Sequence, residues 1–402
     1  MIISPFRGIL YSKKKIKSPA LVYSPPYDII SPSEQDGFYR KSPYNVVRLE
    51  FNKASKGDNE QNSVYTRAAK FLNDWIKQGI LEQDKVPVIY VYGQSFQHNK
   101  KLHNTLGFIA ASKIEQSRHE QVRPHEMTFK APKEDREKVL QIVGANLSCI
   151  YTLIEDRGLK VNSLLRNASK RKPAVDVKID GVRHRIWKLT DPKAVRKLQQ
   201  LMKDKKVFIA DGHHRYEAAA NFRDRMRKED KNFSDESPYN YIMMYFASIQ
   251  DRDLTILATH RVVKELGGIP EKFFQFTPVP NKKEMFKMLN KYSEKAYAFG
   301  LYLDGGFTII KLKDKASEEK LDVAILHKLI LDKVNDIYYT RDPDEAIRLV
   351  NSKKYNAAFF LNPTKAKQIK ETSLKGEKMP HKSTYFYPKL LTGLVMRTFK
   401  EN

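Results

Sequence analysis

Residues 206–216, Lys-Val-Phe-Ile-Ala-Asp-Gly-His-His-Arg-Tyr, run from a short apolar segment straight into a polar turn. The segment from Lys206 to Ala210 is typical of a buried strand. A helix is expected after the turn, because Ala219, Phe222 and Met226 recur on one side of it. A buried strand that continues through a polar turn into a helix is typical of a layered α/β core.

The residues before this stretch extend the same pattern. His184 to Leu189 predicts a strand, and Asp191 predicts the N-cap of a helix with Pro192 in its first turn, where proline is favoured. Residues 183–228 therefore read as strand, helix, strand, polar turn and helix. We expect an α/β to α+β fold with more than one domain.

The polar turn carries the clearest chemistry in the sequence. Gly212 permits a positive φ and a close approach of backbone to ligand, and the helix behind it offers amides and a positive dipole end to an anion. Arg215 can hold a phosphate through two hydrogen bonds, Asp211 can orient a histidine or hold Mg²⁺, and His213 and His214 point in different directions. The alternatives are a turn that only caps the helix and a zinc site, which lacks a third protein ligand at a recognised spacing.

Composition narrows the class of protein. The chain has 402 residues, which suggests two or three domains of about 150 residues. Its 41% hydrophobic residues exclude wholesale disorder, and it has no run of apolar residues long enough to span a membrane. The single cysteine, Cys149, excludes an intramolecular disulfide and a Cys-rich zinc site, and we expect it to be a buried small hydrophobic residue. With no secretory signal at the N-terminus, we expect a cytoplasmic protein.

Positive charge is abundant. Lys and Arg number 73 against 47 Asp and Glu, a net charge of +26. The basic clusters are short, such as Lys13 to Lys15 and Lys203 to Lys206, and no aromatic–glycine motif of an RNA-binding sheet is present. We therefore expect a small anionic ligand or nucleotide rather than nucleic acid as the main partner.

Three domains are expected along the chain. They cover residues 1–156, 175–265 and 270–402, and the polar segment 157–180 is interpreted as a loop or junction. Val46 to Phe51 is interpreted as a strand of the first domain.

Ile209-Ala-Asp-Gly-His-His-Arg-Tyr-Glu-Ala218 resembles the signature of a family of uncharacterised bacterial and archaeal proteins. The other stretches that resemble motifs of this family are spread over nearly the whole chain: Pro5–Gly8, Pro25–Asp28, Ser42–Val46, Pro124–Glu126, Thr259–Arg261 and Lys382–Lys389. The resemblance implies membership of the family without assigning it a function.

The order of elements around the turn is similar to the core of the chromosome-partitioning protein B/sulfiredoxin superfamily, in which the corresponding turn binds nucleotide phosphates. The free-serine kinases of that superfamily have a similar Asp-Gly-His-His-Arg turn and transfer phosphate from a nucleotide to serine. The resemblance implies a mixed α/β core, a nucleoside di- or triphosphate and Mg²⁺ as cofactors, and phosphate contacts from Gly212, His213, His214 and Arg215. It gives Asp211 a magnesium-binding or orienting role.

Weaker candidates lie in the other motifs. Glu126, beside a histidine, could be a general base, or it could lie in a solvated loop. His260 and Arg261 could complete an anion pocket or form a salt bridge at the end of a strand. Lys382 could neutralise a phosphate or belong to a packed terminal strand, and Asp28 lies in a rigid prolyl turn.

These observations favour a nucleotide-dependent phosphotransferase acting on a small hydroxyl-bearing metabolite, with serine as one candidate. Glu126, His213 and Asp211 would then be catalytic. Two other functions stay open: a nucleotide-binding regulator without metabolic turnover, and a metal-dependent hydrolase built on Asp211, His213 and His214.

Overall fold

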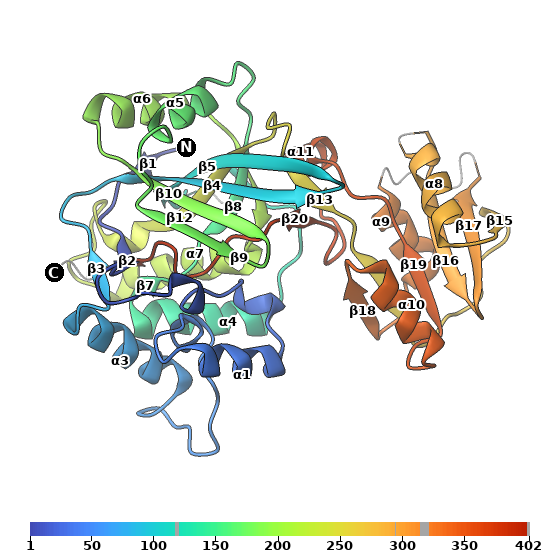
Figure 1. The fold of residues 1–402 in the computed structure, drawn as a ribbon, viewed down its shortest axis with the longest axis horizontal. Coiled ribbons are helices and arrows are strands. Elements are labelled where there is room, and N and C mark those ends of the chain that lie inside the picture. Colours follow the sequence, from blue (N-terminus) through green and yellow to red (C-terminus); the bar gives the residue numbers. More distant parts are fainter. Residues whose placement is uncertain (117–119, 294, 314–320, 400–402) are drawn as a thin grey trace. The chain divides into compact units, whose positions relative to one another are not determined.

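The computed structural model describes residues 1–116, 120–293, 295–313 and 321–399, which form two compact units (Figure 1). The first unit comprises residues 1–124, residues 128–254 and the tail from Pro388, and the second comprises residues 125–127 and 255–387. This division differs from the three expected domains, because one sheet takes strands from both of the first two ranges.

The first unit is built on a sheet that has nine strands among the described residues. Their order is β6-β11-β8-β12-β5-β4-β10-β9, with β1 also paired to β5. The pairs β6–β11 and β8–β12 are parallel and the others are antiparallel, so the fold is mixed α/β, as expected. The strands are β1 (Ile3–Ser4), β4 (Ile89–His98), β5 (Lys101–Lys113), β6 (Val122–Arg123), β8 (Ile150–Ile154), β9 (Val175–Ile179), β10 (Val182–Leu189), β11 (Val207–Asp211) and β12 (Tyr241–Ser248).

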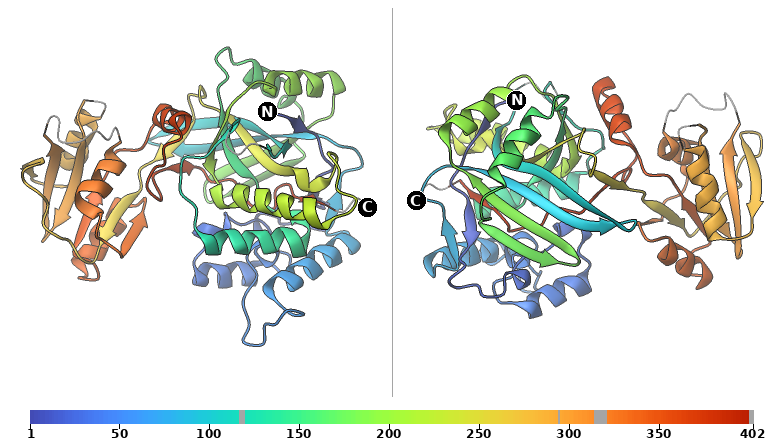
Figure 2. Two further views of the ribbon diagram at one scale, coloured as in Figure 1. Left: turned by 180° about the vertical axis from the view of Figure 1, so that it is seen from behind. Right: turned by 45° about the horizontal axis from the view of Figure 1, so that its top comes forward.

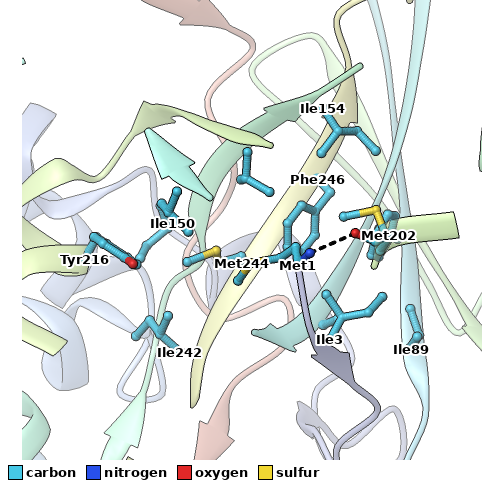
Figure 3. Close-up of a cluster of buried hydrophobic side chains, with 14 of the residues drawn as sticks. Met1, Ile3, Ile89, Ile150, Ile154, Met202, Tyr216, Ile242, Met244 and Phe246 are labelled. Atoms are coloured by element: carbon cyan, nitrogen blue, oxygen red, sulfur yellow. Dashed lines mark hydrogen bonds between the residues drawn. The ribbon is translucent and has the colours of Figure 1, made fainter. Parts of the chain in front are cut away.

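Three helices supply apolar side chains to the main core of this unit: α5 (Lys160–Ala168), α6 (Pro192–Met202) and α7 (His213–Glu229). Figure 3 shows the core from within, where Phe246 of the sheet lies near Met202 of α6 and Ile150 lies near Met244. The amino group of Met1 donates a hydrogen bond of 3.0 Å to the carbonyl oxygen of Met202, which fixes the start of the chain against the core.

The opposite face of the sheet is lined with buried tyrosines. The backbone N–H of Gly8 donates to the hydroxyl of Tyr90 at 2.7 Å, and a Cβ on this glycine would lie 2.3 Å from that oxygen. On the neighbouring tyrosine, Tyr92, the hydroxyl accepts from the backbone N–H of Leu391 at 3.5 Å. The N-terminal turns and the C-terminal tail therefore both pack against this face.

The remaining elements of the first unit are short strand pairs and peripheral helices (Figure 2). The pairs are β2 (Ile9–Tyr11) with β3 (Leu81–Gln83), and β7 (Ala145–Asn146) with β21 (Arg397–Thr398). The helices are α1 (Pro32–Lys41), α2 (Val47–Glu50), α3 (Val64–Lys77) and α4 (Lys130–Lys138), the last continued by a π-turn (Val139–Val143). Short 3₁₀ turns occur at Pro19–Leu21, Tyr27–Ile29 and Pro238–Asn240.

Two local expectations are wrong. The segment Val46 to Phe51 forms the helix α2 rather than a strand, because the Asn45 side chain accepts a hydrogen bond from the backbone N–H of Val47 and starts the helix. Residues 157–180 contain α5 and β9 rather than a loop. The Asp156 carboxylate accepts hydrogen bonds from two backbone amides in the first turn of α5. The residue that stabilises the start of this helix therefore lies just before residues 157–180 and not within them.

The second unit contains a sheet with six strands in the described part of the chain, in the order β15-β17-β16-β19-β14-β18 and antiparallel throughout. The strands are β14 (His260–Val263), β15 (Phe274–Val279), β16 (Ala298–Leu303), β17 (Gly306–Leu312), β18 (Ile337–Thr340) and β19 (Ala357–Phe360), and β13 (Thr255–Leu257) pairs separately with β20 (Tyr385–Tyr387). The helices are α8 (Lys282–Tyr292), α9 (Asp322–Leu326), α10 (Pro343–Asn351) and α11 (Ala366–Lys375), with a π-turn at His327–Leu331. Within the described ranges of both units, no helix has the length and apolar composition needed to cross a membrane.

Candidate functional site

The polar turn joins the end of β11 to the start of α7. Gly212 has φ 94° and ψ 30°, the left-handed conformation that glycine adopts without strain. A Cβ at this position would also lie 2.9 Å from Nη2 of Arg215. Glycine is therefore needed here both for the backbone angle and for the close passage of the arginine.

Asp211 lies between two cations at this turn. Its Oδ2 is 3.3 Å from Nη2 of Arg215, and its Oδ1 is 3.3 Å from Nζ of Lys389. The side chains of the two cations are 10% and 11% exposed, and that of Asp211 is 20% exposed. One carboxylate therefore faces two largely buried positive charges at the N-terminal end of α7.

Lys389 reaches this site from the C-terminal tail, 178 residues after Asp211. The tail is fixed to the first unit by hydrogen bonds on either side of the lysine: Gln94 Nε2 donates to the carbonyl oxygen of Lys389 at 3.2 Å, and the backbone N–H of Thr392 donates to Ser24 at 2.9 Å. The lysine of this motif that the sequence favours as a phosphate ligand is Lys382. Lys389 is the last residue of that motif, and nothing in the neighbouring sequence indicates its contact with Asp211.

The Arg215 guanidinium has internal partners. Nη1 donates to the carbonyl oxygen of Cys149 and, at 3.1 Å, to Oγ of Ser148, while Nη2 donates to Asp211. Burial lowers the pKa of Arg215, but nearby anionic groups, Asp211 foremost and Asp28 among them, outweigh burial and raise the pKa overall. In this arrangement Arg215 fixes the turn and the backbone at Cys149 and remains charged.

A second buried ion pair lies behind Arg215. Nη1 of Arg136 is 3.1 Å from Oε1 of Glu50, with the two side chains only 7% and 4% exposed. Ser148 connects this pair to the turn, because its Oγ donates to the same Glu50 oxygen at 2.9 Å and accepts from Arg215. The guanidinium carbon of Arg136 also lies 3.8 Å from the centre of the Tyr27 ring. A continuous polar network thus runs from Arg136 to Lys389.

This network borders a small cavity of about 30 Å³, lined in part by Glu50, Arg136, Ser148 and Arg215. A cavity of this size holds a water-sized molecule and is far too small for a nucleotide. The network therefore holds the side chains of the turn in place and does not itself form the ligand pocket. Glu50 and Arg136 lie in no motif that indicates chemistry, and only the fold brings them together, so the sequence does not predict this pair.

The two histidines of the turn have different surroundings. His213 is buried, with 5% exposure. Nε2 of His214 accepts a hydrogen bond of 3.0 Å from the backbone N–H of Phe129, and its ring stacks on the Phe129 ring at a centroid distance of 6.1 Å. Cys149, on the neighbouring strand connection, is buried as expected, and burial raises the pKa of its thiol to about 12.

The other candidate residues, Glu126, His260, Arg261 and Lys382, all belong to the second unit. Arg261 is 1% exposed and donates to backbone carbonyl oxygens, including that of Lys382 at 3.0 Å; burial lowers its pKa to about 10. Nδ1 of His260 accepts from the backbone N–H of Leu361 at 3.4 Å, and burial lowers the pKa of His260 to about 4. The candidate residues thus fall in two units. In the second unit, the side chains of Arg261 and His260 form hydrogen bonds with the main chain.

A metal site finds little support in this geometry. Within the described parts of the chain, no group of three or more His, Cys, Asp or Glu side chains is arranged to hold a metal ion. Both carboxylate oxygens of Asp211 face cations, so in this arrangement Asp211 is their counter-ion.

Comparison with solved structures finds several proteins of low similarity. A free serine kinase mutant in complex with AMP is 10% identical, with 70% of this chain and 87% of that chain covered and a TM-score of 0.37. A conserved hypothetical protein from Pyrococcus furiosus is 14% identical, with coverage of 71% and 92% and a TM-score of 0.33. SbnI with a C-terminal truncation from Staphylococcus aureus is 9% identical, with coverage of 71% and 85% and a TM-score of 0.34.

Comparison with curated protein sequences finds no match. A family model does match, over residues 3–329. This range includes the polar turn and five of the six other motifs quoted for the resemblance; Lys382–Lys389 lies outside it. The chain belongs to the family described as "Protein of unknown function (DUF1015)".

Proposed function

We propose that this protein is a nucleotide-dependent phosphotransferase that acts on a small hydroxyl-bearing metabolite, with the phosphates of the nucleotide held at the turn 211–215. The observation that carries the proposal is the convergence of two buried cations, Arg215 and Lys389, on the single carboxylate of Asp211 at the N-terminal end of α7.

The chemistry of phosphoryl transfer suits such a site. Catalysis rests mainly on positioning the phosphates and on neutralising their charge. Gly212 has no side chain to cap α7, and the N-terminal amides of a helix with its positive dipole end favour a bound phosphate. Lys389 supplies the positive charge for the phosphate oxygens, and Arg215 keeps Asp211 and the turn in place.

The resemblance of the turn to that of the free-serine kinases supports a hydroxyl acceptor, with serine as the first compound to test. A base removes the proton of the acceptor hydroxyl, the oxygen bonds to the terminal phosphorus, and the bond from that phosphorus to the nucleotide breaks. Two carboxylates are candidates for the base: Glu126 in the second unit, and Asp28, whose charge acts on Arg215 in the first unit.

The test begins with calorimetric titration of the full chain with nucleoside mono-, di- and triphosphates, followed by an assay of nucleotide consumption with and without serine and related alcohols. Binding together with acceptor-dependent consumption supports the proposal. Binding without consumption favours a nucleotide-binding regulator, and stoichiometric zinc in an elemental assay favours a hydrolase. Absence of nucleotide binding refutes the phosphate site.

A further inference from the structure

Positive charge is concentrated in one part of the first unit. Residues 157–206 contain 16 Lys and Arg against four Asp and Glu, an excess of 12 out of the net +26 of the whole chain. This segment is about one eighth of the sequence, so it carries far more than its share of the charge. In the sequence the basic clusters are short, but the fold places α5, β9, β10 and α6 next to one another in this unit.

The charge borders a groove between α5 and α6, the two helices that lie together in Figure 1. The groove has a volume of about 820 Å³, which is within the range of ligand-binding pockets. Among its lining residues are five cations: Lys160, Arg171, Lys188, Lys193 and Lys197.

The negative charge in this groove is small. Asp191 is the one carboxylate among the described residues that line it, and its Oδ1 already accepts from the backbone N–H of Lys193 at the start of α6. Lys188 pairs with Asp84. The side chains of Lys160, Lys193 and Lys197, and that of Arg171, have no ion-pair partner within the described ranges and are exposed. Four unneutralised like charges around one groove repel one another, and an anionic ligand with several charges relieves that repulsion.

We propose that this groove binds the phosphodiester backbone of nucleic acid without recognising its bases. The cations are spread over α5, α6, β10 and the segment after α5, which suits a chain of phosphates better than a single one. No aromatic residue is among the described residues that line the groove, so it offers no ring for base stacking. The apolar residues Val161 and Leu165 of α5 are buried in the core and unavailable for insertion into a membrane. This site is separate from the turn 211–215 and stands independently of the proposed function.

The test is fluorescence anisotropy of a labelled oligonucleotide of random sequence, titrated with the full chain over a range of KCl concentrations. We expect binding that weakens with salt, with a logarithmic slope set by the number of phosphates neutralised. The variant K193A/K197A should bind more weakly at low salt and should reduce the magnitude of that slope by about 2, so that a fourfold rise in salt weakens its binding roughly tenfold less than it weakens binding by the parent chain. Both lysines are exposed, so thermal unfolding of the variant should match that of the parent chain.

The matched control removes the same charge elsewhere in the first unit. Lys70 and Lys77 of α3 are exposed and have no ion pair within the described residues, so K70A/K77A should leave the slope unchanged. The proposal is overturned by any of three results: no binding at low salt, an equal loss in both double variants, or groove-dependent binding to anionic lipid vesicles in place of nucleic acid. A strong preference for one base sequence would also overturn it.

Discussion

Removal of the Lys389 ammonium tests whether this residue is the phosphate-binding lysine. Its Nζ lies 3.3 Å from Asp211 with the side chain 11% exposed, so Lys389→Ala deletes one of the two cations at the turn. A hydrogen bond to a charged group contributes about 1.5–3 kcal/mol, and every 1.4 kcal/mol is about tenfold in affinity. We therefore expect nucleotide binding to weaken by roughly 10- to 100-fold in calorimetry.

Stability should change less than binding. Breaking a buried ion pair costs about 3–5 kcal/mol when the partner is left alone, but Asp211 keeps Arg215 at 3.3 Å. The variant should therefore stay folded in a urea titration. Lys382→Ala is the informative comparison, because Lys382 belongs to the same motif but lies in the second unit. Loss of binding in Lys382→Ala with normal binding in Lys389→Ala would refute the reasoning from the structure.

Three further outcomes are expected. Asp28→Asn and Glu126→Gln should both bind nucleotide, and the one that abolishes acceptor-dependent turnover identifies the base; normal turnover in both removes both candidates. Glu50→Gln weakens the partner of the buried Arg136 and should lower the free energy of unfolding by up to about 3 kcal/mol in urea, and an unchanged value would contradict a stabilising role for the pair. Burial raises the pKa of Asp322 to about 7, so the folded state favours its neutral form and loses stability as pH rises from about 4 to about 7. Asp322→Asn should accordingly unfold at a higher temperature than the parent chain at pH 8, and the difference between the two unfolding temperatures should shrink toward pH 5. A difference that does not depend on pH would contradict the raised pKa of Asp322 as its cause.

The parts of the fold that could be predicted from sequence are those fixed by short-range chemistry. Asp191 caps its helix as expected, because a cap acts within three residues of the side chain that makes it, and Ser63 caps α3 in the same way. The hairpin of β16 and β17 is of the same short-range kind, because Asp304-Gly305 is a dipeptide that favours a tight turn. By contrast, α2 was interpreted as a strand, because Val46 to Phe51 is apolar enough for either structure and the Asn45 bond that starts the helix lies outside the pattern.

The candidate site divides in the same way. The strand, the positive-φ glycine and the helix of the turn follow from eleven consecutive residues, and the structure has them as expected. The cation opposite Asp211 does not follow from them, since Lys382 and Lys389 are equivalent in type and only the path of the tail distinguishes them. The charged groove was missed for a related reason: its basic residues are scattered over about 40 positions and become neighbours only through the pairing of α5 with α6.

The path of the chain makes the proposed phosphate site dependent on a segment near the C-terminal end of the sequence. The chain leaves the first unit after Leu254, forms the second unit and returns at Pro388, one residue before Lys389. Arg397 then fixes the tail, since its buried guanidinium donates to the carbonyl oxygens of Tyr241 and Pro238 at 3.0 Å. Until this tail is in place, the site lacks Lys389, the lysine that we assign to the phosphate. The proposed phosphate site therefore takes one of its two cations from the segment that follows the second unit in the chain, so we expect a chain cut before Pro388 to bind nucleotide as weakly as Lys389→Ala does.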